Sequence, residues 1–516
     1  MDVMKQQKIY GLYFFVIILS FVITSLSIYY YPVFSSDTLY YLVTAQTYLQ
    51  QGFHAAEAIY PWPWYSILIA YAAKILHLSL LHTAYLLNYI FFAGISILFI
   101  SLVRSFTTDW LVLLAAAFFI LTFRPLTKYS HFILRDNPYW FFMMLSIYCF
   151  VRYMKQPGWW LALGWSLTTF FAGLMRMEGW FFLLLAPWLV FLVSEERLLK
   201  RLGHFLQLNC LMIIGGLVLL SYFFLFGSHQ LVYLGKFYNF LVALPTGGVF
   251  SFNTAHIKTN QLASSILPVV SAGYASLFLL AGLIAVNIWL FFSALSLVHL
   301  INLFYCNKCG VIIRSKAGLA LIGYIAINCL ILILFSLQTF NFVPRYFQLI
   351  ALLVLVFSVF GFVHLYQSWQ NKRTKYNKIM FPLVIFLLLI MTVGSLIRTG
   401  PNKAFVYQAG NWLQQHASAS DKLYTNSGQI AWFSKLTNTV GWQCGYIGVV
   451  NDSTCFIPAN LNTKPWSGNR FVVIVIDQKQ TPTLASELNS SLGTQPIKTF
   501  CERTKCAVIY DLQNTH

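Results

Sequence analysis

The feature that most constrains this chain is a series of apolar runs, each long enough to cross a bilayer as a helix. A helical span needs about 20 predominantly apolar residues, and runs of this kind recur from residue 9 to residue 397. They lack the polar–apolar alternation of a transmembrane barrel. The chain is 59% hydrophobic and 9% charged, whereas a soluble domain carries about a quarter charged residues. The sequence therefore predicts a polytopic α-helical membrane protein.

We predict about eleven spans, with residues 62–77 forming an interfacial or re-entrant helix. The first run is too long for a signal-peptide core and precedes no small-residue cleavage site, so we expect an uncleaved anchor with a cytoplasmic N-terminus. The Lys/Arg clusters then fall in alternate loops, as the positive-inside rule requires, which leaves the C-terminus outside. The predicted spans lie near residues 9–30, 83–103, 109–123, 138–154, 159–175, 179–194, 206–226, 268–298, 317–337, 345–366 and 379–397.

Residues 398–516 have a more polar composition than the membrane domain predicted for residues 1–397. Strand-like runs occupy Phe471–Asp477 and Cys506–Leu512, and a helix-like stretch runs from Asn402 to His416. The sequence therefore predicts a small extracytoplasmic α/β domain at the C-terminus.

Four of the nine cysteines lie in this tail, and an even set in an oxidising compartment suggests disulfides. The simplest of the three possible pairings joins Cys444 to Cys455 and Cys501 to Cys506, with free buried thiols as the alternative. Cys306-Asn307-Lys308-Cys309 falls in a predicted cytoplasmic loop. Because no second CxxC accompanies it, we interpret it as structural rather than as a zinc site.

The net charge of +19 does not by itself indicate nucleic acid. In a membrane protein, basic excess usually reflects topogenic Lys/Arg and contact with anionic headgroups. We therefore expect membrane lipids and no nucleic acid among the partners, although a polyanionic acceptor or a lipid phosphate would use the same charge.

Only eight acidic residues precede the tail, and four of them fall on the predicted outer side, each next to the end of a span. Carboxylates close to the hydrocarbon are costly and usually mark function or ion pairing. These four suggest a site on that side. They are Asp37, Glu57, Asp136 and Glu178.

Each of these acids also has a simpler interpretation. Asp37 could cap the amphipathic, interfacial helix predicted from Leu39 to Gln51. Asp136 could cap the next span or pair with the adjacent Arg135. A lone arginine at an outer helix end, such as Arg345, is often a headgroup contact.

The order of several short motifs resembles a known family. The chain shows Asp37-Thr38-Leu39-Tyr40-Tyr41, Gln51-Gly52-Phe53 and a Pro/aromatic stretch at 60–65 (YPWPWY), followed by 134–142 (LRDNPYWFF), 176–179 (RMEG), 344–349 (PRYFQL) and 409–434. In this order they resemble the GT-C polyprenyl-phosphate-sugar glycosyltransferases. The resemblance is to the branch of aminoarabinose transferases, protein O-mannosyltransferases and lipopolysaccharide-core galacturonosyltransferases. Many members carry two adjacent acids where this chain has Asp37 alone, which leaves the sugar and the acceptor open.

The resemblance implies a GT-C-like fold and an inverting transfer from a polyprenyl-phosphate-linked sugar to a glycolipid or protein hydroxyl. It also implies the outer face of a bacterial inner membrane. Asp37 would be the general base, and Asp136 would be a second catalytic residue that binds acceptor, sugar or metal. The donor phosphate would be neutralised by Arg176 and Arg345, with Arg135 and Lys128 behind them.

The remaining candidates would bind substrate. They are Glu57, Tyr60, Trp62, Trp64, Tyr65, Glu178 and His54. The aromatic residues could equally form an interfacial belt. Glu57, Glu178 and His54 could also complete a site for a divalent metal ion, and metal dependence is open.

Two other functions compete with the enzyme. A glycan or lipid flippase or transporter would place charges at the membrane midplane and broken helices in paired halves, and the sequence shows neither. A non-catalytic membrane scaffold, with the tail as its binding domain, would tolerate Asn in place of Asp37 and Asp136.

Overall fold

The computed structural model describes the chain with the exception of residues 1–2, 31–32, 227–252, 341, 372–374, 397–402, 437–438, 441–465, 478–480, 503–504 and 515–516. Contacts divide the chain into two compact units. The first comprises Met1–Ser27 and Thr44–Ile397, and the second comprises Ile28–Val43 and Arg398–His516. The second unit thus includes a short N-terminal segment in addition to the tail.

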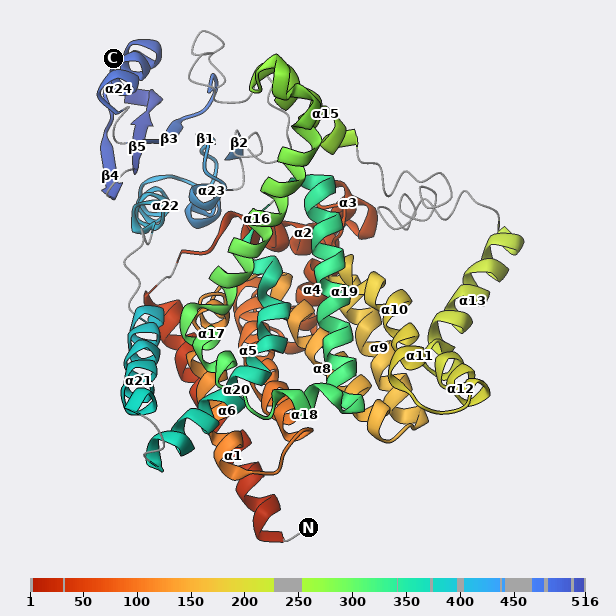
Figure 1. The fold of residues 1–516 in the computed structure, drawn as a ribbon. Helices are drawn as coiled ribbons and strands as arrows, with labels where there is room; N and C mark the ends of the chain where they lie inside the picture. The colour runs from red at the N-terminus through yellow and green to blue at the C-terminus, as the bar shows by residue number, and fades with distance from the viewer. Residues whose placement is uncertain are drawn as a thin grey trace. The chain divides into compact units, whose positions relative to one another are not determined.

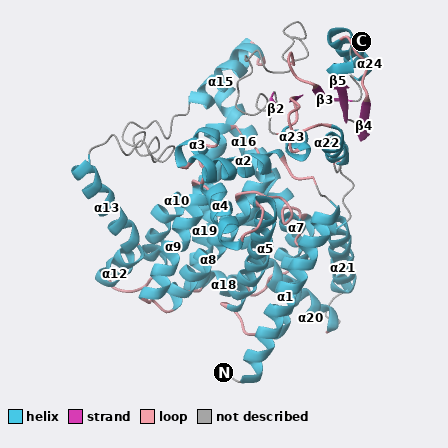
Figure 2. Ribbon diagram, turned by 180° about the vertical axis from the view of Figure 1, so that it is seen from behind, coloured by secondary structure: helices cyan, strands magenta, loops and turns pink. Residues whose placement is uncertain are grey.

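Helices make up the described part of the first unit, and the strands lie in the second (Figure 2). The long helices are α1 (Val3–Tyr30), α2 (Ser36–Gln51), α4 (Trp64–Leu76), α5 (Leu80–Arg104), α6 (Trp110–Thr122), α8 (Asp136–Lys155), α9 (Trp159–Met175), α12 (Leu198–Leu208), α13 (Cys210–Phe226), α15 (Asn253–Ser265), α16 (Ala275–Leu295), α19 (Lys316–Thr339), α20 (Gln348–Gln370) and α21 (Lys375–Leu396). The short ones are α3 (Phe53–Ile59), α7 (Arg124–Thr127), α10 (Glu178–Leu185), η1 (Ala186–Trp188), α11 (Leu189–Val193), η4 (Val269–Tyr274), α17 (Leu297–Phe304), α18 (Cys309–Arg314) and η5 (Pro344–Phe347). Because the unit boundaries fall at Ser27 and Val43, α1 and α2 contribute residues to both units.

The prediction of a polytopic helical membrane protein is confirmed, and every predicted span overlaps a helix. By length and composition, five helical segments of the described chain can cross a membrane, or six if the bent pair α12–α13 is one span. Other predicted spans fall on shorter apolar helices such as α6 and α9. Shorter helices of this kind do not fix the number of crossings by length alone.

Helix α20 lies in the interior of the first unit, with most of its side chains buried. It packs against α6, α16 and α17 (Figure 1). Gly361 on α20 lies so close to α17 that an added Cβ would be 1.7 Å from the carbonyl oxygen of Asn302. Small residues permit this backbone approach between membrane helices.

The second unit contains a five-stranded sheet in the order β2-β1-β3-β5-β4. Strand β1 is parallel to both β2 and β3, whereas β5 is antiparallel to β3 and β4. The strands are β1 (Leu423–Thr425), β2 (Thr439–Val440), β3 (Phe471–Asp477), β4 (Lys498–Glu502) and β5 (Lys505–Asp511). The helices are α22 (Ala404–His416), α23 (Gly428–Ser434), α24 (Thr481–Leu492) and the terminal η7 (Leu512–Asn514). The predicted C-terminal α/β fold is therefore confirmed, including the strand at Phe471–Asp477.

Alternating side chains of β3 pack into two different core layers, one on each face of the sheet. Phe471 and Val473 pack with residues of α22 and α23 on one face of the sheet. Val472 and Ile474 pack with Leu488 of α24 on the other. Because successive strand residues point to opposite faces, a strand covered on both faces is apolar throughout.

Four of the described cysteines form two disulfides, and Cys149, Cys210 and Cys329 are free. Cys501 joins Cys506 across the β4–β5 pair, where the two residues are register partners. Cys306 joins Cys309 between α17 and α18. The predicted partners Cys444 and Cys455 lie outside the described residues.

Candidate functional site

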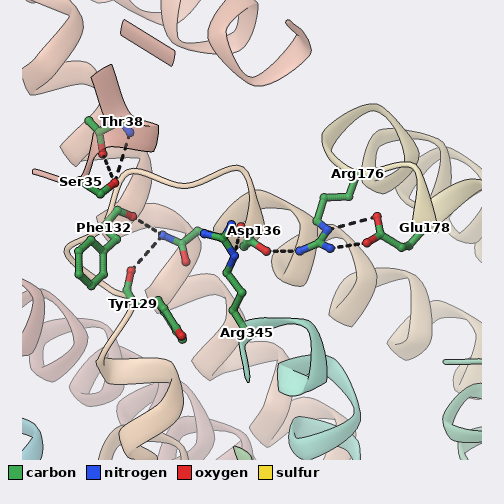
Figure 3. A network of polar contacts seen from close by, with 9 residues as sticks. Ser35, Thr38, Tyr129, Phe132, Asp136, Arg176, Glu178 and Arg345 are labelled. Atoms are coloured by element: carbon green, nitrogen blue, oxygen red, sulfur yellow. Dashed lines mark hydrogen bonds and ion pairs between the residues drawn. The ribbon is translucent and has the colours of Figure 1, made fainter. Parts of the chain in front are cut away.

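A cluster of ion pairs forms in the first unit where helices α8, α9, α10 and η5 end or begin (Figure 3). Arg176 occupies the turn between α9 and α10. Its Nη1 donates to Oδ1 of Asp136, its Nη2 donates to Oε1 of Glu178, and its Nε donates to Oε2 of Glu178 at 3.2 Å. The Glu178 contact is the bidentate guanidinium–carboxylate arrangement, which fixes orientation as well as charge.

Arg176 is buried within this cluster. Its side chain is 4% exposed and that of Asp136 is 3% exposed. The rings of Tyr139 and Tyr346 lie 5.3 Å and 4.4 Å from its guanidinium carbon, within reach of cation–π attraction. Burial alone would lower the pKa of Arg176, but the carboxylates of Glu178 and Asp136 outweigh it and hold the pKa well above its usual value. Arg176 is therefore a permanently charged anchor for two acids.

Arg345 is the more accessible cation of the cluster. It lies in η5, directly after Pro344 and before α20. Its Nε is 3.9 Å from Oδ2 of Asp136, and its side chain is 24% exposed. Asp136 thus faces a buried guanidinium on one oxygen and a solvent-accessible one on the other (Figure 3).

The position of Asp136 is set by the loop that leads into α8. Asp136 is the first residue of α8. The side-chain amide of the next residue, Asn137, donates to the carbonyl oxygens of Phe132 and Tyr129 at 2.9 Å and 3.2 Å. It also reaches Oδ1 of Asn88 at 3.2 Å, and Asn88 in turn donates to Phe132. Buried, well-satisfied polar networks of this kind hold a backbone rigidly.

The Pro/aromatic stretch supports the same region. Trp62 is buried, and its Nε1 donates to the carbonyl oxygen of Leu174 at 2.6 Å, two residues before Arg176. The guanidinium of Arg135 lies 5.7 Å from the centre of the Tyr60 ring. Trp62 thus braces the end of α9, and Tyr65 is also buried in α4. Trp64 packs against Phe53, with 5.7 Å between ring centres.

Asp37 lies in the second unit, in the first turn of α2. The hydroxyl of Ser35 accepts a hydrogen bond from the backbone N–H of Thr38 at 3.3 Å and contacts the Thr38 hydroxyl at 3.0 Å (Figure 3). Ser35 therefore makes the capping contact that Asp37 could have made. The half-buried Asp37 is stabilised near a helix N-terminus by the helix dipole.

The other predicted site residues lie on or next to different elements. Glu57 and His54 are on α3. Lys128 is exposed, with its ammonium 5.6 Å from the centre of the Tyr129 ring. Within the described part of the chain, no three His, Cys, Asp or Glu side chains are grouped so that they could hold a metal ion.

Sequence reasoning missed four residues that shape the cluster: Asn88, Asn137, Tyr139 and Tyr346. Asn137 and Tyr139 lie within the motif at 134–142, and Tyr346 lies within the motif at 344–349, so the signal for these three was the motif itself. Asn88 gave only a weak one, as an amide within an apolar span.

Solved structures with a similar arrangement of elements identify the fold. The chain superposes on ArnT from Cupriavidus metallidurans bound to undecaprenyl phosphate with a TM-score of 0.54 and 12% identity, over 97% of this chain and 98% of that one. It superposes on the archaeal oligosaccharyltransferase AglB from Archaeoglobus fulgidus, in complex with an inhibitory peptide and a dolichol-phosphate, with a TM-score of 0.52 and 11% identity. That match covers 95% of this chain and 72% of AglB. The chain has the GT-C fold.

The GT-C likeness extends over both units, because the ArnT match covers nearly all of both chains. No family model and no curated protein sequence matches the chain. At this identity the GT-C likeness establishes the fold, and the chemistry has to be argued from the residues.

Proposed function

We propose that this GT-C protein is an inverting glycosyltransferase that moves a sugar from a polyprenyl-phosphate donor to an envelope acceptor. The acceptor would be a lipopolysaccharide or lipid A saccharide, or a protein hydroxyl. The observation that carries the proposal is a solvent-accessible Arg345 held by a buried ion-pair cluster within a GT-C fold. The lipid phosphates named for the ArnT and AglB structures support a lipid-phosphate donor.

In the proposed reaction, the acceptor hydroxyl oxygen attacks the anomeric carbon while the bond from that carbon to the phosphate oxygen breaks. Asp37 takes or orients the hydroxyl proton as general base. Inversion needs only this one base and a good leaving group. Because Ser35 makes the capping contact of α2, Asp37 is not required there for helix formation.

Arg345 would stabilise the departing lipid phosphate. Phosphate leaves with the bonding electron pair, so a fixed guanidinium near it stabilises the charge that develops. Arg176 is less suited to this role, because its charge is already balanced by Asp136 and Glu178 and its side chain is buried. We therefore assign Arg176 and Asp136 to holding Arg345 rather than to contacting the sugar.

The proposal includes the membrane arrangement predicted from the sequence: eleven spans, the C-terminal domain outside, and the outer face of a bacterial inner membrane as the site of reaction. A donor embedded in the bilayer must be reached at the interface, where the ends of α8, α9 and α20 would lie.

The proposal is tested by mass spectrometry of envelope glycans in a deletion strain complemented with wild type, Asp37→Asn or Asp109→Asn. Asp109 is a matched control, because its side chain caps α6 by accepting from the backbone N–H of Leu111 at 3.0 Å, and Asn caps equally well. We expect one sugar mass to disappear on deletion and to return with wild type and Asp109→Asn only. Full restoration by Asp37→Asn would contradict the enzyme and favour a transporter or scaffold.

Donor binding is tested separately by thermal unfolding of the purified full chain with and without undecaprenyl phosphate. A ligand that binds only the folded protein raises the unfolding midpoint by mass action. Arg345→Ala should abolish the increase, whereas Arg314→Ala, at an exposed arginine of α18, should retain it. An undiminished increase with Arg345→Ala would remove Arg345 from the phosphate site.

A further inference from the structure

The segment just before Asp37 is anchored in the C-terminal fold. Phe34 lies three residues before Asp37 and is 3% exposed. The Nε2 of Gln429 donates to the carbonyl oxygen of Phe34 at 2.8 Å, across 395 residues of sequence. The Phe34 ring lies 5.1 Å from that of Phe433 and 6.3 Å, edge-on, from that of Trp432. All of these residues belong to the second unit.

One face of α23 makes these contacts. Gln429, Trp432 and Phe433 are three and four residues apart, so they share a side of the helix. A buried hydrogen bond to a backbone carbonyl and two aromatic contacts together fix both the path of the chain at Phe34 and the rotation of its ring.

Helix α23 is itself tightly held. Its Phe433 packs so closely on α22 that a Cβ added to Gly410 would lie 2.4 Å from the Phe433 Cβ. Ile430 is fully buried in the core that α22 and α23 form with the sheet. Because α23 is packed firmly in the α/β fold, its contacts with Phe34 hold the N-terminal segment in a fixed position.

The link from Phe34 to Asp37 is short and ordered. Ser35 makes the capping contact with Thr38, so the helical geometry of α2 is established as soon as the segment leaves Phe34. An Asp in the first turn of a capped helix has its Cα position fixed by that turn.

Asp37 also interacts electrostatically with a lysine of the tail. Displacement of water by neighbouring protein atoms and the nearby Lys505 lower the pKa of Lys403, and the Asp37 carboxylate acts in the opposite direction. Lys403 lies just before α22 and is exposed. The Asp37 carboxylate favours its charged form.

We propose that Gln429, Trp432 and Phe433 are positioning residues for Asp37, so that the C-terminal α/β domain is an integral part of the catalytic apparatus rather than an appended binding module. This inference rests on the proposed role of Asp37 as the general base. The reaction concerned is the proposed sugar transfer.

The decisive variant is Gln429→Glu, which keeps the size of the side chain but replaces the N–H donor by an oxygen facing the Phe34 carbonyl. The readout is the rate at which the sugar mass appears after induction of the full chain in the deletion strain, per amount of folded protein. We expect a loss of about tenfold to a hundredfold, because a misplacement of the order of 1 Å costs that much. Gln414→Glu, at an exposed glutamine of α22, is the matched control and should retain the wild-type rate.

Two measurements separate positioning from simple stability. For Gln429→Glu we expect a lowered thermal midpoint, because a carboxylate replaces a buried amide and faces a carbonyl oxygen. We also expect a lowered rate per folded molecule, with the increase in midpoint on adding undecaprenyl phosphate retained. A purely structural role predicts a lowered midpoint with a normal rate per folded molecule, and would overturn the inference. Phe34→Leu keeps an apolar side chain and should show the same rate loss.

The outcomes distinguish this inference from the proposed function. If Asp37→Asn is inactive while Gln429→Glu and Phe34→Leu both retain the wild-type rate, the positioning inference is overturned and the glycosyltransferase proposal stands. If Asp37→Asn is fully active, both fail together. Rate loss in both Gln429→Glu and Asp37→Asn, with a normal Gln414→Glu, supports both.

Discussion

Arg176 donates a hydrogen bond from Nη1 to Oδ1 of Asp136, and both side chains are almost fully buried. The pair joins the turn after α9 to the first residue of α8. A buried pair contributes little net stability compared with apolar residues, but removal of one partner leaves an uncompensated charge. Since Glu178 shares the same guanidinium, Arg176 balances two carboxylates and is the residue on which the cluster depends.

We therefore predict that Arg176→Ala destabilises the protein by about 3–5 kcal/mol, since breaking a buried ion pair from one side costs that much. Thermal unfolding of the detergent-solubilised chain should show a lowered midpoint. Arg314→Ala removes an exposed arginine and should change stability by about 0.5 kcal/mol or less. Equal midpoints for the two variants would show that Asp136 and Glu178 do not need Arg176 as their counter-charge.

The glycine after Glu178 makes a second, steric prediction. A Cβ added to Gly179 would lie 2.3 Å from the backbone nitrogen of Gly173, so α10 cannot stay in place on α9. We expect Gly179→Ala to displace Glu178 from Arg176 and to lower the unfolding midpoint, with a cost of about 1–3 kcal/mol for overpacking.

Gly164→Ala in α9 is the control for this prediction. An added Cβ at Gly164 meets only the Cys149 sulfur, at an ordinary 3.5 Å. Since Ala exceeds Gly in helix propensity by about 1 kcal/mol, the control should be neutral or stabilising. If Gly179→Ala were as stable as Gly164→Ala, α9 and α10 could separate enough to accept the added Cβ at little cost in stability.

Much of the fold could be predicted because membrane helices and doubly covered strands have strong patterns. The strand at Phe471–Asp477 is apolar throughout, and the structure places it at the predicted residues. Helix α22 begins at Ala404, close to the predicted start at Asn402. The grouping of Ile28–Val43 with the tail was not predictable, because it depends on contacts between segments distant in sequence, such as that between Phe34 and Gln429.

The site was predictable in composition but not in geometry. Rare charges in an apolar chain pointed to Asp136, Arg176, Glu178 and Arg345, and the structure brings these four together. Nothing in the spacing shows that Arg176 is buried and paired with two acids while Arg345 keeps access to solvent. That difference arises from how the ends of separate helices meet, and it changes the role assigned to Arg176.

The two disulfides give a prediction about topology. Cys501–Cys506 would lie in the oxidising compartment if the tail is outside, whereas Cys306 and Cys309 would lie in the reducing cytoplasm. In cells we therefore expect Cys501–Cys506 to be oxidised and Cys306 and Cys309 to be free thiols, although the structure joins the latter pair. The measurement is labelling with a membrane-impermeant maleimide, located by mass spectrometry of peptides.

Under this topology, the exposed Cys501 should react only after a reductant is added outside intact cells, and Cys306 and Cys309 only after permeabilisation, without reductant. Cys506→Ser is the control, because it leaves the exposed Cys501 without its partner and should make Cys501 reactive from outside at once. External labelling of Cys306 and Cys309 after reduction would instead place their loop outside. In the predicted arrangement an odd number of spans separates that loop from the tail. An external loop would therefore require either a tail on the cytoplasmic side or a different number of spans, and labelling of Cys501 in Cys506→Ser decides between the two.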